Sequence, residues 1–213
     1  MITIDGGTLE GGGQIVRSAV SLAALLGQPL RIESVRAGRS APGLQPQHLT
    51  AVRAAARIRD AELEGDELGS QAFTFAPMRP AHPGQYVFDV AVESGRGSAG
   101  AVGLVLQTVL LPLALAGAES MVTLRGGTHV PWAPPATYIE QVLLPALEPI
   151  GVRAQLELVR WGFYPAGGGE VQLRVAPADG PLQPLTMLER GVLRTVRGTA
   201  AAMNLPSHIP HRM

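Results

Sequence analysis

The 213-residue chain contains no cysteine and no lysine. Without cysteine, a disulfide framework, a thiolate zinc site and a cysteine nucleophile are all excluded. Without lysine, the chain has no phosphate-binding lysine of the P-loop type, no Schiff base and no covalent lysine–nucleotide adduct. Any covalent step carried out by these residues must therefore use serine, threonine, tyrosine, histidine or a carboxylate.

Aromatic side chains are also scarce, at 4% of the chain, so we expect a core of alanine, valine, leucine and isoleucine. The 46% hydrophobic content indicates a globular protein. The N-terminal segment MITIDGGTLE lacks the basic and apolar regions of a signal peptide. The most apolar run, residues 99–118, contains Gln107 and Pro112, which favours a buried helix over a membrane span. The composition therefore predicts a soluble cytoplasmic protein.

The formal net charge is zero, but the charges are unevenly placed. Residues 11–59 contain seven arginines and one acid, Glu33, for a net charge of +6. Residues 60–119 contain two arginines and eight acids, for a net charge of −6. A locally basic face can attract phosphate groups even when the whole chain is neutral.

An internal repeat is the strongest structural signal. The segment RIESVRAG, from residue 31, matches SMVTLRGG, from residue 120, and the match pairs Arg36 with Arg125. In each copy an apolar helix precedes this segment, and a proline-rich loop and a second helix follow it. The predicted helices span 13–26 and 47–58 in the first copy and 99–116 and 136–150 in the second. A kink is expected at Pro145.

Strand-like alternation closes each copy, in QAFTFAP and YVFDVAV of the first and in QLELVRW and EVQLRVAP of the second. We therefore predict an α/β (α+β layered) fold, in which βαβαββ units are repeated and helices pack on sheets. The predicted core spans 1–182, divided into units of about 1–92 and 93–182.

Residues 183–213 are predicted to begin a smaller inserted domain. GVLRTVRGTAAA has the pattern of a strand, and LPSHIPHRM that of a helix capped by Ser207. Because such a helix would stop within its first turns, we expect the chain to be truncated.

Two segments of the first copy carry candidate functional residues. In EGGGQIVR, at 10–17, three glycines precede a helix that carries Arg17; glycines allow close approach of a ligand and helix N-termini favour anions, although a tight turn would also explain them. In RAGRSAPGLQPQHLT, at 36–50, the side chains of Arg36, Arg39, Gln47 and His48 suit phosphate contacts, although a solvated loop is the alternative.

Two segments of the second copy match this arrangement. GGTHVPWAPP, at 126–135, lies at the equivalent place, so the two copies are expected to face each other across a cleft. Trp132 could stack on a base and His129 could act as a base or ligand, but a lone tryptophan is more often core, and a lone histidine is usually neither. GFYPAGGGE, at 162–170, indicates close packing or approach to a ligand. The HIPH segment lacks a third metal ligand.

Five of these segments together resemble the successive motifs of the RNA 3′-terminal phosphate cyclases. In chain order they read LEGGGQIVRSAVSLA, IESVRAGRSAPGLQPQHLTAVRAAA, GSAGAVGLVLQTVLLPLA, GGTHVPWAPPATYIEQVLLP and GFYPAGGGEV. The resemblance implies a ligase that uses ATP and Mg²⁺ or Mn²⁺ to convert an RNA 3′-phosphate into a 2′,3′-cyclic phosphate. It implies a histidine–AMP adduct, transfer of AMP to the RNA 3′-phosphate, and attack by the 2′-hydroxyl with release of AMP. A histidine adduct agrees with the lack of lysine.

The resemblance also implies roles for individual residues. Catalytic contacts to the reacting phosphates would come from Arg17, Arg39 and Gln47. Glu10 would hold the metal near the ATP phosphates. ATP would be bound by Arg36, Gln107 and Pro131, the last of these beside the adenine.

In the family the nucleophilic histidine lies far downstream, and none of the five histidines here matches its context. These are His48, His82, His129, His208 and His211. We therefore expect the nucleophile outside this chain, and we expect the 213 residues alone to be inactive.

The implied partners are ATP and RNA 3′-phosphate ends, with no membrane, and a homodimer is left open. Two alternatives remain. Some cyclase-like proteins of ribosome biogenesis bind RNA without cyclase activity, but Glu10, Arg17, Arg39 and Gln107 favour the enzyme. Enolpyruvyl transferases contain similar repeated α/β units, which is an analogy of fold alone.

Overall fold

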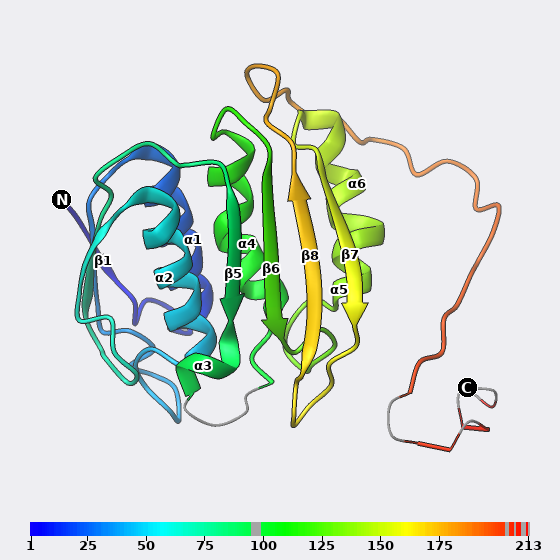
Figure 1. The fold of residues 1–213 in the computed structure, drawn as a ribbon, viewed down its shortest axis with the longest axis horizontal. Coiled ribbons are helices and arrows are strands. Elements are labelled where there is room, and N and C mark those ends of the chain that lie inside the picture. Colours follow the sequence, from blue (N-terminus) through cyan, green and yellow to red (C-terminus); the bar gives the residue numbers. More distant parts are fainter. Residues whose placement is uncertain (95–98, 203–204, 207, 210–211, 213) are drawn as a thin grey trace.

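The computed structural model describes residues 1–94, 99–202, 205–206, 208–209 and 212. Two four-stranded mixed sheets and the helices packed on them form the body of the molecule (Figure 1). This arrangement confirms the predicted α/β layered fold.

The first sheet is built from residues 2–76. Its elements are β1 (Ile2–Asp5), α1 (Gly13–Leu26), β2 (Leu30–Glu33), α2 (Pro46–Arg59), β3 (Glu62–Glu64) and β4 (Phe73–Ala76). The strand order is β1-β2-β4-β3, in which β1 and β2 are parallel and the other pairs antiparallel.

The second sheet repeats this order as β5-β6-β8-β7, with the same parallel and antiparallel pairs. Its elements are β5 (Gln85–Asp89), α3 (Val90–Ser94), α4 (Val102–Ala114), β6 (Ser120–Gly126), α5 (Ala136–Tyr138), α6 (Leu144–Leu147), β7 (Ala154–Arg160) and β8 (Gly169–Val175). A π-helical turn over Ile139–Leu143 joins α5 to α6, and a 3-10 turn over Glu148–Ile150 follows. This widened turn ends two residues before Pro145, which has no N–H for a regular helix.

The matching orders confirm the βαβαββ repeat, but one strand assignment was wrong. YVFDVAV does not close the first unit: its strand, β5, pairs in parallel with β6 and so opens the second sheet. Its last three residues, 90–92, were also predicted as strand, but they lie in helix α3. The strand that completes the first unit is β3, with the short sequence ELE. A strand of three residues at a sheet edge is too short for its alternation of polar and apolar residues to be recognised. The alternation in β5 identifies a strand, but it does not indicate which strand β5 pairs with. The boundary between the sheets therefore lies between β4 and β5.

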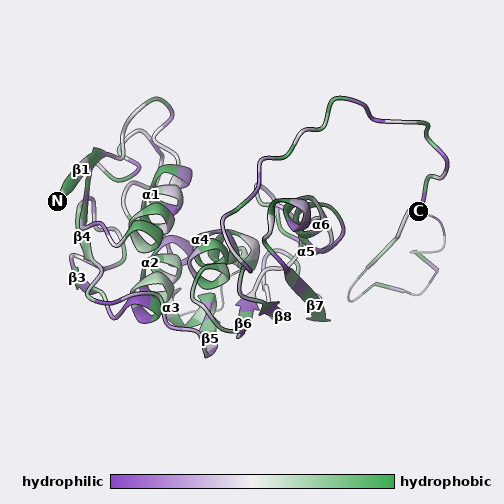
Figure 2. Ribbon diagram, turned by 90° about the horizontal axis from the view of Figure 1, so that it is seen from above, coloured by the Kyte–Doolittle hydropathy of each residue, from purple (hydrophilic) through white to green (hydrophobic). Residues whose placement is uncertain are grey.

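Helices α1, α2 and α4 lie between the two sheets (Figure 2). Helix α2 belongs to both cores, because Ala51 and Ala54 pack with the second sheet while Val52 and Ala55 pack with the first. Alanine leaves little side-chain bulk between helices, so α2 can be buried on two faces. This packing brings the beginnings of helices from both units close together.

The apolar run at residues 99–118 forms α4, which is buried in the second core as predicted. Gln107 is the exposed residue in the middle of this helix. Within the described part of the chain, none of the helices combines the length and apolar character that crossing a membrane would need.

The predicted strand in GVLRTVRGTAAA was wrong, because described residues 191–202 contain neither strand nor helix. This segment leaves the two sheets in Figure 1, and residues 199–202 come to lie near the end of β7, where they share a pocket with residues 159–161. A strand needs a neighbour to pair its backbone N–H and C=O groups, and no described strand pairs with this segment. The predicted helix cap, Ser207, lies outside the described residues.

Candidate functional site

Three helix N-termini meet where the two units pack together. The Oε1 atom of Gln47, at the start of α2, accepts the N–H of Ala101, which directly precedes α4, at 3.2 Å. A Cβ atom added to Gly13, the first residue of α1, would overlap the ring of His48 in α2. Backbone N–H groups at helix N-termini carry partial positive charge, so their convergence favours an anionic ligand.

Arg17 lies beside this convergence, on the second turn of α1, and is only 7% exposed. Its Nε donates to Oε1 of Gln107 at 3.3 Å, and its Nη2 donates to Oε1 of Gln14 at 2.9 Å. Among the described residues, no carboxylate lies within ion-pair distance of its guanidinium. Burial lowers the pKa of Arg17 to about 10, so the group is still charged at neutral pH. A buried cation with only neutral partners is costly, and an anion would compensate it.

The contact between Arg17 and Gln107 joins the two units across 90 positions of the sequence. The sequence predicted both residues for the site, and the structure brings them together. Gln14, the second partner of Arg17, was not predicted, although it lies within the EGGGQIVR segment.

Glu10, Arg36 and Arg39 lie in the loops around the start of α1. Nη2 of Arg39 is 3.2 Å from Oε2 of Glu10, and the Glu10 side chain is 88% exposed. Nη1 of Arg36 donates to the backbone carbonyls of Ala41 and Gly43. Burial, together with the neighbouring Arg39, lowers the pKa of Arg36. The hydrogen bonds of Arg36 therefore stabilise the proline-rich loop, while the side chains of Arg39 and Glu10 face solvent.

His48 is enclosed between the beginnings of α1 and α2. The residue is 3% exposed, and its Nδ1 accepts the N–H of Gln45 at 3.2 Å. Burial, reinforced by the charges of Arg36 and Arg17, lowers the pKa of His48 to about 3. The ring is therefore neutral at physiological pH and fixes the positions of both helix ends.

An open cleft of about 620 Å³ lies between the units. Its lining consists of Gln47, Ala99, Gly100, Val130, Pro131, Trp132, Tyr164 and Pro165. Gln47 and Pro131, which were both predicted for the site, thus line the same cleft from different units. Trp132 is fully exposed and has a positive φ of 64°, so the expectation that it belongs to the core was wrong. Tyr164 was not predicted, and its signal was the glycine-rich segment that follows it.

His129 sits behind this cleft in an aromatic cluster. Its ring stacks on Trp161 at 4.4 Å between centroids, and Phe163 lies at 5.7 Å. Its two nitrogens lie 2.9 Å and 3.1 Å from the hydroxyls of Thr128 and Thr137. Both nitrogens therefore have protein partners, which indicates a structural role.

Among the described residues, no group of three or more His, Asp or Glu side chains is placed to hold a metal ion. Of the HIPH segment, His208 is described and exposed, whereas His211 lies outside the described residues.

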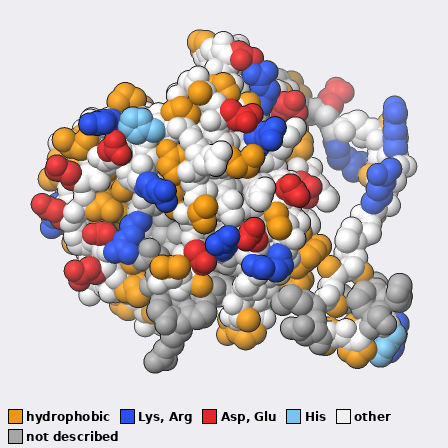
Figure 3. Space-filling model, in the orientation of Figure 1, with side chains coloured by type: hydrophobic (Ala, Val, Ile, Leu, Met, Phe, Trp, Pro, Cys, Tyr) orange, Lys and Arg blue, Asp and Glu red, His pale blue; other side chains and the backbone are white. Residues whose placement is uncertain are grey.

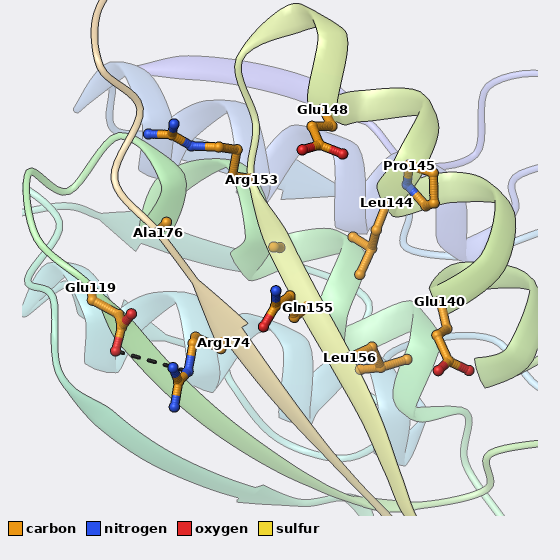
Figure 4. A pocket seen from close by; sticks show the side chains of 11 residues that line it. Glu119, Glu140, Leu144, Pro145, Glu148, Arg153, Gln155, Leu156, Arg174 and Ala176 are labelled. Carbon is orange, nitrogen blue, oxygen red and sulfur yellow. Dashed lines mark ion pairs between the residues drawn. The ribbon is translucent and has the colours of Figure 1, made fainter.

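A separate pocket of about 580 Å³ lies between α6 and the first half of β7 (Figure 4). Its walls carry Glu119, Glu140 and Glu148 together with Arg153 and Arg174. Arg174 pairs with Glu119 at 3.9 Å, as the dashed line in Figure 4 shows. None of the residues predicted for the site lines it. Its mixed charges and its distance from the helix N-termini separate it from the candidate site.

Comparison with known proteins agrees with the motifs. The sequence profile of the family described as RNA 3′-terminal phosphate cyclase matches residues 8–206. The chain is 55% identical over 213 residues to a protein of Gloeothece citriformis named RNA 3′-terminal phosphate cyclase, and 56% identical to one of that name from Nostoc punctiforme. In each case the alignment covers 100% of this chain and 61% of the relative. A relative of the same name from Caldivirga maquilingensis is 46% identical, with 58% of its length covered.

Among solved structures, the enolpyruvyl transferase NikO from Streptomyces tendae aligns with a TM-score of 0.38 and 16% identity, over 76% of this chain and 29% of that one. The family profile spans most of the chain and agrees with the named relatives. The chain belongs to the RNA 3′-terminal phosphate cyclase family.

Proposed function

We propose that the site at the three helix N-termini binds ATP and the 3′-phosphate end of an RNA, and that it serves the ATP-dependent conversion of that end into a 2′,3′-cyclic phosphate. The printed names of the relatives support this substrate class. The chain spans about 61% of the length of these relatives, so the proposal concerns the part of the site that these residues supply.

The observation that carries the proposal is the buried guanidinium of Arg17. It is 7% exposed, has amide oxygens as its described partners, and lies beside helix N-termini from both units. A phosphate oxygen would supply the missing negative charge and would accept charge-assisted hydrogen bonds. Arg39 and Gln47, which border the same region, would add further donors to the phosphates.

In the proposed reaction, AMP on the RNA phosphate serves as the leaving group. The neighbouring 2′-hydroxyl loses its proton and attacks the phosphorus, while the bond from phosphorus to AMP breaks. Because the attack is intramolecular, it has a high effective molarity. Arginine side chains and helix N–H groups would offset the negative charge that develops on the phosphate oxygens.

Glu10 would supply one carboxylate to a divalent cation, with the substrate phosphates as further ligands. Mg²⁺ in sites of this kind is commonly held by one or two carboxylates together with substrate phosphates. The exposed Glu10 carboxylate pairs with Arg39, and it would exchange this partner to bind Mg²⁺ or Mn²⁺, which requires no rearrangement of the core. The cation would neutralise charge on the ATP phosphates.

We also propose that none of the five histidines of this chain receives AMP, because none has the sequence context of the family's nucleophile. The positions of three of them also argue against that role. His48 is enclosed and His129 has protein partners at both nitrogens. His82 lies 3.2 Å from Asp60, the residue that caps the far end of α2. That end is about 20 Å from the helix start, given 1.5 Å per residue.

Binding of ATP and of short RNAs to the purified chain tests the proposal. We expect tighter binding of a 3′-phosphorylated RNA than of the same RNA with a 3′-hydroxyl, and we expect Arg17→Met to weaken binding of both ATP and the phosphorylated RNA. Arg153→Met, at the distant pocket, is the matched control. Equal affinity for the two RNA ends would contradict the proposal. Label retained on the denatured protein after incubation with α-labelled ATP would contradict the statement about the nucleophile.

A further inference from the structure

A second cleft, of about 420 Å³, lies between α2 and β5, and we call it the α2–β5 groove. Its lining consists of Thr50, Arg53, Arg57, Val87, Phe88, Asp89, Val92 and Arg125. Strand β5 is an edge of the second sheet, so the groove runs along the line where the first unit meets the second. None of the residues predicted for the candidate site lines this groove.

The groove combines basic and apolar side chains. The guanidinium of Arg57 lies 5.7 Å and 5.9 Å from the ring centres of Tyr86 and Phe88. Val87 and Val92 are large apolar side chains of the lining that are 50% and 74% exposed. The rings of Tyr86 and Phe88 are each 8% exposed, so they hold Arg57 and do not offer a face to a base; the exposed apolar surface is that of the two valines. Positively charged grooves that follow the backbone are typical of proteins that bind single-stranded nucleic acid.

The three arginines of the groove differ in whether a carboxylate of the chain already pairs with them. Arg53 pairs with Asp66 at 2.8 Å, and Arg125 pairs with Glu170 at 2.9 Å. For Arg57, by contrast, the described part of the chain places no carboxylate within ion-pair distance. The lining also carries the carboxylate of Asp89, whose Oδ1 accepts the N–H of Ala91 at 2.8 Å. The charge of Arg57 is held against the two rings and remains available to an external anion.

The groove and the cleft of the candidate site lie along the same helix, α2, without sharing a lining residue. On one wall, Gln47 lines the cleft of the candidate site, while Thr50 and Arg57 line the groove further along α2. On the other wall, Arg125 lies near the end of β6, just before the segment that places Pro131 in the cleft. Figure 3 shows basic side chains over α2 and the adjoining strands on this face, with acidic ones between them.

The length of this path matches a short stretch of RNA. Ten residues separate Gln47 from Arg57 on α2, which corresponds to about 15 Å at 1.5 Å per residue. Stacked nucleotides are spaced by about 3.4 Å along a strand, so about four nucleotides span this distance.

We propose that the α2–β5 groove binds the RNA strand upstream of its 3′-terminal phosphate, and that Arg57 contacts a backbone phosphate about four nucleotides from the end. This inference rests on the proposed function, because it requires the 3′ end to lie in the cleft beside Gln47. A contact to phosphate is independent of base identity, so the groove lengthens the RNA footprint without specifying a sequence.

Oligoribonucleotides of different length test the proposal. We expect the chain to bind a 3′-phosphorylated octanucleotide more tightly than a 3′-phosphorylated dinucleotide in fluorescence anisotropy. Arg57→Met is expected to weaken octanucleotide binding about 3- to 10-fold, to leave dinucleotide binding unchanged, and to reduce the salt dependence by about one charge. Arg57→Lys should retain most of the affinity for the octanucleotide. Arg153→Met, which removes a distant surface arginine, should leave the affinity for both oligonucleotides unchanged.

Three outcomes would overturn this inference. The first is equal affinity of the chain for the octanucleotide and the dinucleotide. The second is an Arg57→Met variant that loses the same affinity for both oligonucleotides. The third is an Arg57→Lys variant that binds the octanucleotide as weakly as Arg57→Met does. If the octanucleotide and the dinucleotide each bind no better with a 3′-phosphate than with a 3′-hydroxyl, the proposed function fails as well. If the chain prefers the 3′-phosphate but its affinity does not depend on RNA length, only the inference about the groove is overturned and the proposed function stands.

Discussion

His48 gives this protein a defined sensitivity to acid. Its buried ring has a pKa lowered to about 3 by burial and by the charges of Arg36 and Arg17. In the unfolded chain the ring titrates at about 6.5. Between pH 6.5 and pH 3 the unfolded state therefore binds a proton that the folded state does not bind. The contribution of His48 to stability is fully present above about pH 6.5 and is lost progressively as the pH falls below it.

The size of the effect follows from this difference. Each pH unit below 6.5 removes about 1.4 kcal/mol from the free energy of unfolding, which gives about 2 kcal/mol at pH 5. His48→Gln is the test variant, because its amide oxygen can accept the N–H of Gln45 but does not titrate. We expect urea unfolding at pH 5 and pH 7.5 to show a loss of stability about 2 kcal/mol larger in the parent than in the variant. Identical pH dependence in both proteins would refute this reasoning.

Three further substitutions probe the site. Gly13→Ala should lower the free energy of unfolding by about 1–3 kcal/mol, because the new methyl group overlaps His48, and the loss should disappear in a His48→Ala background. Gln107→Ala removes the oxygen that accepts the Nε–H of Arg17, so calorimetry should show about 5-fold weaker ATP binding; an unchanged affinity would contradict this role. Trp132→Phe should abolish quenching of tryptophan fluorescence by ATP, because Trp132 is fully exposed at the cleft; persistent quenching would implicate the other tryptophan.

The long helices were predictable from local pattern, whereas the short helix α3 was missed and the sheets were predictable only in part. The sequence predicts a helix over 13–26, and α1 covers Gly13–Leu26, because an apolar period and flanking glycines define both ends. Alternation also marked the strand at residues 86–92, but its assignment to the first unit was wrong. Sheet membership depends on pairing with β6, more than thirty positions further on, and alternation carries no information about that partner.

The chemical types of the site residues were predictable, but their arrangement was not. Glycine, arginine and glutamine in a repeated loop indicated phosphate contacts, and the structure places Arg17, Gln47 and Gln107 around one convergence of helices. The contact between Arg17 and Gln107 depends on how α1 packs on α4, which no local pattern specifies. For the same reason the sequence grouped His48 with the arginines, although the structure shows it buried as a spacer between helices.

The site is therefore a property of the interface between the two units. Ala51 and Ala54 let α2 approach the second core, which brings Gln47 to Ala101, and the packing of α1 on α4 brings Arg17 to Gln107. Without ligand, this interface holds a buried cation whose described partners are neutral, and such a charge weakens the packing around it. A bound phosphate would compensate that charge and would bind only when both units are in place. Ligand binding should consequently stabilise the packing of one unit on the other, because any ligand specific for the assembled form shifts the equilibrium toward it.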